Sequence, residues 1–167
     1  RRVRRAYPHI RSQRLELDFA RLKEDIGHLV TVLPAVVYLL HFLRHLGKQV
    51  YLVTNAHPET LRIKMKHSGL AAWFHRCLCS HEVGAAKEQP LFWQRLHHFL
   101  PHRKERTLMV DDSEKVLSAA AAYGIGHLRH IAKPSSRLPA APSPRFPLIL
   151  SFTELLDDPL PNSDDSL

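Results

Sequence analysis

Three polar groups in this chain are of the types that bind a phosphoryl group and a divalent cation. The acidic pair Asp111-Asp112 follows the apolar run 107–110, and adjacent carboxylates supply the oxygen ligands that Mg²⁺ prefers. Thr54-Asn55 follows a second apolar run, and Lys87 lies in a loop further along the chain. A hydroxyl, an amide and an ammonium can donate hydrogen bonds to phosphate oxygens and offset their charge. The residue types therefore predict a phosphate-and-magnesium site.

Alternating apolar runs and helical patterns predict the elements that position these groups. Short apolar runs of the kind found in buried parallel strands lie at 49–54, 76–80, 106–110 and 127–132. Helices are predicted at 34–46, 58–69, 90–100 and 113–123, with proline, serine or glycine at the ends. Such alternation forms a parallel α/β sheet covered on both faces, and ligands bind at the carboxyl ends of its strands. The predicted fold class is therefore α/β.

The three groups resemble, in order and spacing, the last three motifs of the haloacid dehalogenase (HAD) superfamily of phosphohydrolases. That family carries an Asp-x-Asp nucleophile motif, a Thr or Ser after the second strand, a Lys and a final acidic motif. Thr54, Lys87 and Asp111-Asp112 match the last three, separated by 33 and 24 residues. The strings at 52–58 and 110–114, and the Lys87-Glu88 pair where many relatives have Lys-Pro, resemble the bacterial GMP/IMP 5'-nucleotidase branch most. The resemblance covers about residues 15–155.

This resemblance implies a three-layer HAD-like Rossmannoid sheet and a Mg²⁺-dependent phosphohydrolase. The substrate would be a small phosphorylated molecule, a purine nucleoside monophosphate such as GMP or IMP. Asp111 would be a metal ligand, and Asp112 would bind the metal through water or orient the site. Lys87 and Thr54 would act in catalysis. The Lys87 ammonium, the Thr54 hydroxyl and the Asn55 backbone would bind the phosphate oxygens.

One family motif is missing, because no Asp-x-Asp occurs anywhere in the 167 residues and the first residue is Arg1 rather than methionine. We therefore expect an N-terminally truncated chain that lacks the first, central strand, its nucleophile and part of a helical cap, and that is inactive alone. Two alternatives stay open. The first is a catalytically inactive HAD-like protein that binds phosphorylated ligands or partner proteins. The second is a nucleic-acid-binding module.

The predicted organisation has three parts. Residues 1–30 are expected to be a remnant of the helical cap, and residues 31–156 the HAD-like core without its first strand. Within the core, five prolines at 133–147 predict a surface loop and 151–156 predict a capped terminal helix. Residues 157–167, rich in aspartate and proline, are expected to be a disordered tail.

The net charge of +8 is concentrated near the N-terminus, in Arg1, Arg2, Arg4, Arg5, Arg11 and Arg14. Such an arm can bind nucleic acid. Tyr7 is the one aromatic residue between these arginines that could stack on bases, so a solvated face of the cap is the favoured interpretation.

Cysteine and histidine positions give no strong metal signal. Cys77 and Cys79 alternate on one predicted strand, a spacing poor for a disulfide and short of a zinc site, so we expect free thiols and a cytoplasmic protein. His41 and His45 share a helix face but have no third ligand nearby. The longest apolar stretch, 34–46, is too short to span a bilayer, so we expect no membrane association.

Overall fold

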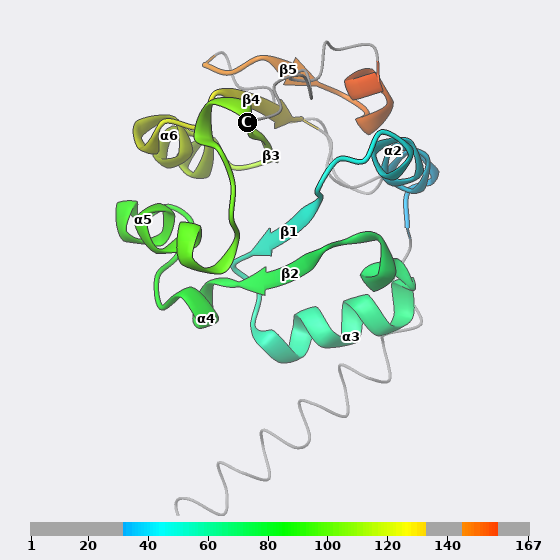
Figure 1. Ribbon diagram of the computed structural model, residues 1–167, viewed down its shortest axis with the longest axis horizontal. Coiled ribbons are helices and arrows are strands. Elements are labelled where there is room, and N and C mark those ends of the chain that lie inside the picture. Colours follow the sequence, from blue (N-terminus) through cyan, green and yellow to red (C-terminus); the bar gives the residue numbers. More distant parts are fainter. Residues whose placement is uncertain (1–31, 133–144, 157–167) are drawn as a thin grey trace, which may run out of the picture.

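Strands and helices alternate along the chain in the computed structural model, which describes residues 32–132 and 145–156 (Figure 1). The helices are α2 (Pro34–His45), α3 (Pro58–Ser68), α4 (Ser80–Val83), α5 (Pro90–Phe99) and α6 (Glu114–Tyr123). The strands are β1 (Tyr51–Thr54), β2 (Arg76–Cys79), β3 (Leu108–Asp111), β4 (His127–Ile131) and β5 (Leu148–Ile149). Short 3-10 helices are η3 (Leu70–Trp73), η4 (Lys104–Arg106) and η5 (Phe152–Leu156). The predicted α/β class is confirmed.

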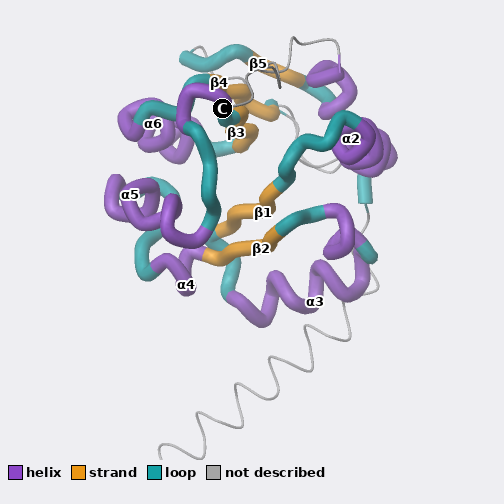
Figure 2. Tube along the Cα trace, viewed as in Figure 1, coloured by secondary structure: helices purple, strands orange, loops and turns teal. Residues whose placement is uncertain are grey.

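The strands form two separate parallel sheets rather than one. β1 pairs with β2, and β3 pairs with β4, which pairs in turn with β5. Figure 2 shows the two groups of strands apart from each other, with β1 and β3 on the facing sides. Among the described residues no strand lies between them. The break falls at the position where the sequence predicts that a central strand is missing.

Helices pack on both faces of the strands. The larger apolar cluster joins α4, α5 and α6 to β2, and its fully buried centre includes Phe92, Trp93 and Leu78. A smaller cluster on the other face of β4 and β5 joins Leu39 of α2 to Leu155 of η5. The two clusters hold α2, β1 and β3 in place without a hydrogen-bonded strand between β1 and β3.

Local capping explains where several helices begin and end. The side chain of Ser113 accepts a hydrogen bond from the Val116 N–H at 3.4 Å, which caps α6 as the sequence predicts. Gly124 follows α6 with a φ of +104°, a conformation that glycine adopts without steric cost. Pro34, Pro58 and Pro90 occupy the first turns of their helices.

Several elements differ from the prediction. The strand predicted from residue 49 begins at Tyr51, and the terminal helix predicted at 151–156 is the 3-10 helix η5. The strand predicted to reach Ser80 ends at Cys79, because the Glu82 carboxylate accepts the Cys79 N–H at 3.0 Å and starts α4. The strand predicted from residue 106 begins at Leu108, after η4. β5 was not predicted, since two residues after a proline-rich segment form a strand only by pairing with β4.

Several predictions concern residues that the structure does not describe. They are the cap remnant and arginine arm within residues 1–30, most of the proline-rich loop, and the tail at 157–167. Within the described ranges, no helix combines the length and the apolar character that a membrane crossing requires.

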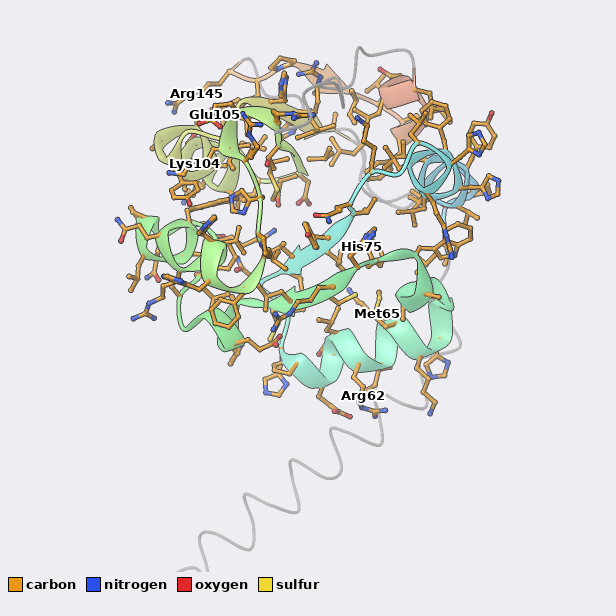
Figure 3. All side chains as sticks on the ribbon, in the orientation of Figure 1. Arg62, Met65, His75, Lys104, Glu105 and Arg145 are labelled. Carbon is orange, nitrogen blue, oxygen red and sulfur yellow. The ribbon has the colours of Figure 1, made fainter. Side chains whose placement is uncertain are left out.

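The two cysteines lie on β2 as free thiols. Figure 3 shows Met65 extending from α3 toward β2, where the Cys77 Sγ lies 3.8 Å from its Sδ. Burial raises the pKa of the Cys77 thiol above its usual value, because the charged thiolate loses hydration. A raised pKa lowers the thiolate fraction and therefore the reactivity of this residue.

The loop before β4 leaves no room for a side chain at Gly126. A Cβ added there would lie against the Glu105 carbonyl oxygen and 2.9 Å from the carbonyl carbon. We expect Gly126→Ala to lower the free energy of unfolding by about 1–3 kcal/mol, the usual cost of overpacking. Urea denaturation would measure this. Ala121→Ser, which adds one atom at an exposed position, serves as the control and should change stability by no more than about 0.5 kcal/mol.

Candidate active site

An ion pair joins the carboxyl end of β3 to the loop after α4. The Lys87 Nζ lies 2.6 Å from Oδ2 of Asp111, and the two side chains are only 12% and 6% exposed. The other carboxylate oxygen, Oδ1, accepts the Ser113 N–H at 2.9 Å. The structure thus brings together two residues that are 24 positions apart, as the sequence predicts for a site at the strand ends.

The backbone of Lys87 is held on both sides. Its N–H donates to Asn55 Oδ1 at 3.0 Å. Its carbonyl accepts the indole N–H of Trp93 at 2.7 Å. These bonds connect the Lys87 loop to the end of β1 and to α5.

Both polar atoms of the Asn55 side chain form hydrogen bonds with other residues of the chain. While its oxygen accepts from Lys87, its Nδ2 donates to both carboxylate oxygens of Glu88 at 2.9 and 3.1 Å. The predicted contact of Asn55 with phosphate oxygens uses its backbone N–H, which these bonds do not involve. The side-chain amide instead links two loops at the carboxyl ends of the strands.

Thr54 is the last residue of β1 and is partly buried. Its Oγ1 accepts the Ala56 N–H at 3.1 Å. A threonine hydroxyl can accept and donate at the same time, so its proton is still able to reach a phosphate oxygen.

The two acidic residues differ in their surroundings. Asp111 is buried beside Lys87, whereas Asp112 is exposed. Asp111 is the last residue of β3, whereas Asp112 lies in the bend that follows the strand. The structure therefore places Asp111 in the ion pair and leaves Asp112 at the surface.

The carboxylate oxygens near the end of β3 suit Mg²⁺, which keeps several water ligands, better than a metal ion whose ligands all come from the protein. No group of three or more His, Cys, Asp or Glu side chains arranged to hold a metal ion is found in the parts of the chain that the structure covers. Mg²⁺ typically binds one or two carboxylates and fills its other positions with waters and substrate phosphate. Asp111 could supply one such carboxylate, and the exposed Asp112 could bind through water. His41, in contrast, packs its ring edge-on against Trp73 at 5.9 Å.

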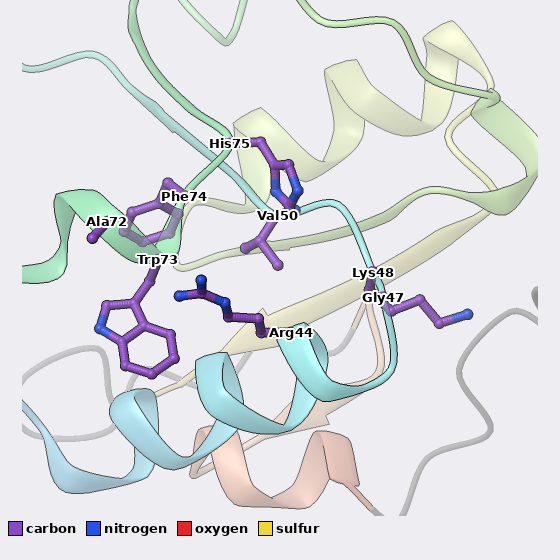
Figure 4. Close-up of a pocket in the computed structure, with 8 residues that line it drawn as sticks. All are labelled: Arg44, Gly47, Lys48, Val50, Ala72, Trp73, Phe74 and His75. Carbon is purple, nitrogen blue, oxygen red and sulfur yellow. The ribbon is translucent and has the colours of Figure 1, made fainter.

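A surface pocket of about 200 Å³ lies at the opposite end of β1 (Figure 4). Figure 4 shows Arg44 extending toward Trp73, and the guanidinium carbon is 5.7 Å from the ring centroid. The His75 Nδ1 accepts the Val50 N–H at 3.1 Å on the far side of the pocket. None of the predicted site residues lines this pocket, so it is separate from the Lys87–Asp111 pair.

Two residues of the site were not recognised in the sequence. Glu88 was noted only as the neighbour of Lys87, and Trp93 only as a core residue, which its 2% exposure confirms. The available signal was that a buried tryptophan N–H usually needs a hydrogen-bond partner. Sequence alone does not identify that partner as the Lys87 carbonyl.

Comparisons with known proteins give consistent results. A family model described as haloacid dehalogenase-like hydrolase matches residues 4–124. The chain is 32% identical over 145 residues to the GMP/IMP nucleotidase YrfG of Escherichia coli K12, and equally to that of Shigella flexneri. The match covers 87% of this chain but 65% of the nucleotidase, so the chain spans less than two thirds of these relatives.

Solved structures share the fold. The HAD-hydrolase YfnB from Bacillus subtilis, bound to magnesium, superposes with a TM-score of 0.67 at 22% identity, over 86% of this chain and 61% of that one. A HAD phosphatase from Thermococcus onnurineus gives a TM-score of 0.66 at 24% identity, over 83% and 63% of the two chains.

Proposed function

The chain belongs to the haloacid dehalogenase-like hydrolase family, and from this premise we propose that it is part of a Mg²⁺-dependent phosphomonoesterase acting on purine nucleoside 5'-monophosphates such as GMP and IMP. The substrate class is supported by the similarity to the E. coli GMP/IMP nucleotidase. The reaction class is supported by the site itself.

The observation that carries the proposal is the buried Lys87–Asp111 pair beside the end of β1. An ammonium group has three donors, and Asp111 Oδ2 accepts one of them. The other two can bind phosphate oxygens and offset the charge that accumulates on them during transfer. The Thr54 hydroxyl and the Asn55 backbone N–H would donate to the same oxygens.

Asp111 would be a metal ligand, Asp112 would bind the metal through water or orient the site, and waters and the substrate phosphate would fill the other positions. When bound, Mg²⁺ reduces the repulsion between a phosphate dianion and the carboxylates that surround it. The ion pair with Lys87 would hold the Asp111 carboxylate in place beside the metal. No zinc-like ligand set is needed for this role.

The nucleophile is not among these residues, because the 167 positions contain no Asp-x-Asp. We propose that the attacking carboxylate comes from a strand that occupies the space between β1 and β3. Its attack on phosphorus would form an aspartyl phosphate and break the bond to the nucleoside 5'-oxygen, which would take a proton from the second Asp of the motif and leave as the nucleoside. The same Asp would then activate a water that hydrolyses the aspartyl phosphate and releases phosphate, so that one displacement is divided into two easier steps. Without that strand we expect no turnover.

The test compares this chain with an extended version to which an apolar strand ending in Asp-x-Asp is added ahead of Arg1. Phosphate release from GMP, IMP and an aryl phosphate is measured with and without EDTA. We expect Mg²⁺-dependent release of phosphate from GMP and IMP by the extended version and none by the chain alone. Turnover by the chain alone that survives EDTA would contradict the proposal.

A second candidate function rests on the same missing motif. A HAD-like protein without its nucleophile could bind phosphorylated ligands through Thr54, Lys87 and Mg²⁺ without hydrolysing them. Mg²⁺-dependent binding of GMP by a chain whose genomic reading frame encodes no Asp-x-Asp strand would favour this alternative. The nucleic-acid alternative depends on the arginine arm and predicts salt-dependent binding that is lost with that arm.

A further inference from the structure

We propose that Asn55, Glu88 and Trp93 form a clamp whose role is to position the Lys87 ammonium. The term Lys87 clamp denotes these three residues below. The inference rests on the proposed function only in assigning the Lys87 ammonium to phosphate binding. We call the three side chains positioning residues, because Asn55 and Trp93 bind the backbone of Lys87 and Glu88 binds Asn55, whereas the phosphate would bind the Lys87 ammonium.

The first half of the clamp holds the N–H side of Lys87. Asn55 lies one residue beyond β1 and accepts the Lys87 N–H through Oδ1 at 3.0 Å. An unconstrained amide could rotate away, but the Asn55 Nδ2 donates to both Glu88 oxygens at 2.9 and 3.1 Å. A carboxylate acceptor makes these bonds stronger than neutral ones. Glu88 therefore fixes Asn55, and Asn55 fixes Lys87.

The second half holds the carbonyl side. The Trp93 indole is 2% exposed and packs against Phe92, with ring centroids 5.4 Å apart, so its position is set by the core. Indole nitrogen can only donate, and here it donates to the Lys87 carbonyl at 2.7 Å. The peptide unit before Lys87 is thus tied to Asn55 after β1, and the peptide unit after it is tied to Trp93 in α5.

The reason for holding this backbone lies in the length of the lysine side chain. A lysine side chain has four rotatable bonds and loses much rotamer entropy when its ammonium is fixed. The position of the ammonium therefore depends on the position of the Lys87 backbone. The 2.6 Å contact with Asp111 is a short ion pair between largely buried groups. A shift of the Lys87 backbone would lengthen it, and misplacement by about 1 Å can cost on the order of 10²-fold in rate.

The experiment measures the reactivity of each lysine toward an amine-acylating N-hydroxysuccinimide ester. Rates are read by mass spectrometry in the 167-residue chain and its variants. Lys87 should react slowly because its ammonium is paired with Asp111 and its side chain is 12% exposed. The exposed Lys64 and Lys115 serve as internal references for the reagent, because their rates should not depend on the clamp. Circular dichroism of each variant shows whether a faster Lys87 reaction comes from general unfolding.

We expect Asn55→Ala and Trp93→Phe each to raise the Lys87 rate roughly 2- to 10-fold relative to the reference lysines, the effect of losing one hydrogen bond. Glu88→Gln retains one acceptor for Asn55 and should give a smaller rise. Trp73→Phe is the matched control, because Trp73 is partly buried in η3 and lies away from Lys87; it should leave the Lys87 rate unchanged.

An unchanged Lys87 rate in both Asn55→Ala and Trp93→Phe, with wild-type circular dichroism, would overturn the clamp. If a core change such as Trp93→Phe unfolds the chain, the exposed Asn55 and Glu88 variants still decide the question. The labelling needs no catalytic turnover. A failed clamp therefore leaves the phosphatase proposal standing, and an inactive extended enzyme leaves the clamp standing.

Discussion

Lys87→Met will lower the free energy of unfolding by about 3–5 kcal/mol, the typical cost of removing one partner from a buried ion pair. The remaining Asp111 carboxylate, 6% exposed, would keep only the Ser113 N–H as a partner. Methionine has a similar length and packs well, so the loss reports the charge rather than a cavity. Urea denaturation in the presence of EDTA measures this, since EDTA prevents a metal ion from replacing the lysine charge.

The matched control is the double variant Lys87→Met/Asp111→Asn. Asparagine retains an oxygen that can accept the Ser113 N–H but carries no charge. Replacing both members of a buried ion pair by neutral groups is often close to neutral in stability. We therefore expect the double variant to be more stable than Lys87→Met. A single variant that loses less than about 1 kcal/mol would show that the pair behaves like a solvent-exposed one.

The carboxyl ends of β1 and β3 and the caps of α6 could be predicted because they are determined locally. Asp111 and Thr54 end short apolar runs, and such runs form buried strands in an alternating α/β chain. Ser113 and Gly124 bound α6 by contacts within one or two turns. The proximity of Lys87 to Asp111 followed from family resemblance and from the rule that ligands lie at the carboxyl ends of strands.

The hydrogen bonds that hold Lys87 could not be predicted from the sequence. Asn55 and Glu88 are 33 positions apart, and their contact exists only after the end of β1 and the loop after α4 come together. β5 is a similar case, because it owes its strand geometry to β4. Local sequence describes which groups can donate or accept, whereas tertiary packing selects their partners.

The separation of β1 from β3 leaves backbone groups directed away from their partner strands. The Val50 carbonyl accepts the His75 N–H at 2.8 Å, and the Thr107 carbonyl accepts the His127 N–H at 3.1 Å. Successive residues of a strand direct their N–H and C=O to opposite sides. The backbone groups of Val53 and Val110 therefore face the position of the missing strand. Open strand edges of this kind promote aggregation.

A peptide that supplies this strand should stabilise the chain. We expect an apolar, β-branched peptide of about six residues that ends in Asp-x-Asp to pair in parallel with β1 and β3, with its acidic end near Lys87. A ligand at 100 times its Kd stabilises by about 2.7 kcal/mol, which corresponds to a rise in Tm of roughly 5–11 °C for a chain of this size. Differential scanning fluorimetry over a peptide titration measures the shift.

The control peptide has the same composition with proline at its centre, which removes a donor and disfavours a central strand. It should leave Tm unchanged. Without peptide we expect the chain to be marginally stable or to aggregate, because each unpaired buried polar group costs about 1–3 kcal/mol against a total of roughly 5–15 kcal/mol. A cooperative melt of the monomer well above ~65 °C, insensitive to the strand peptide, would show instead that the chain completes its own sheet.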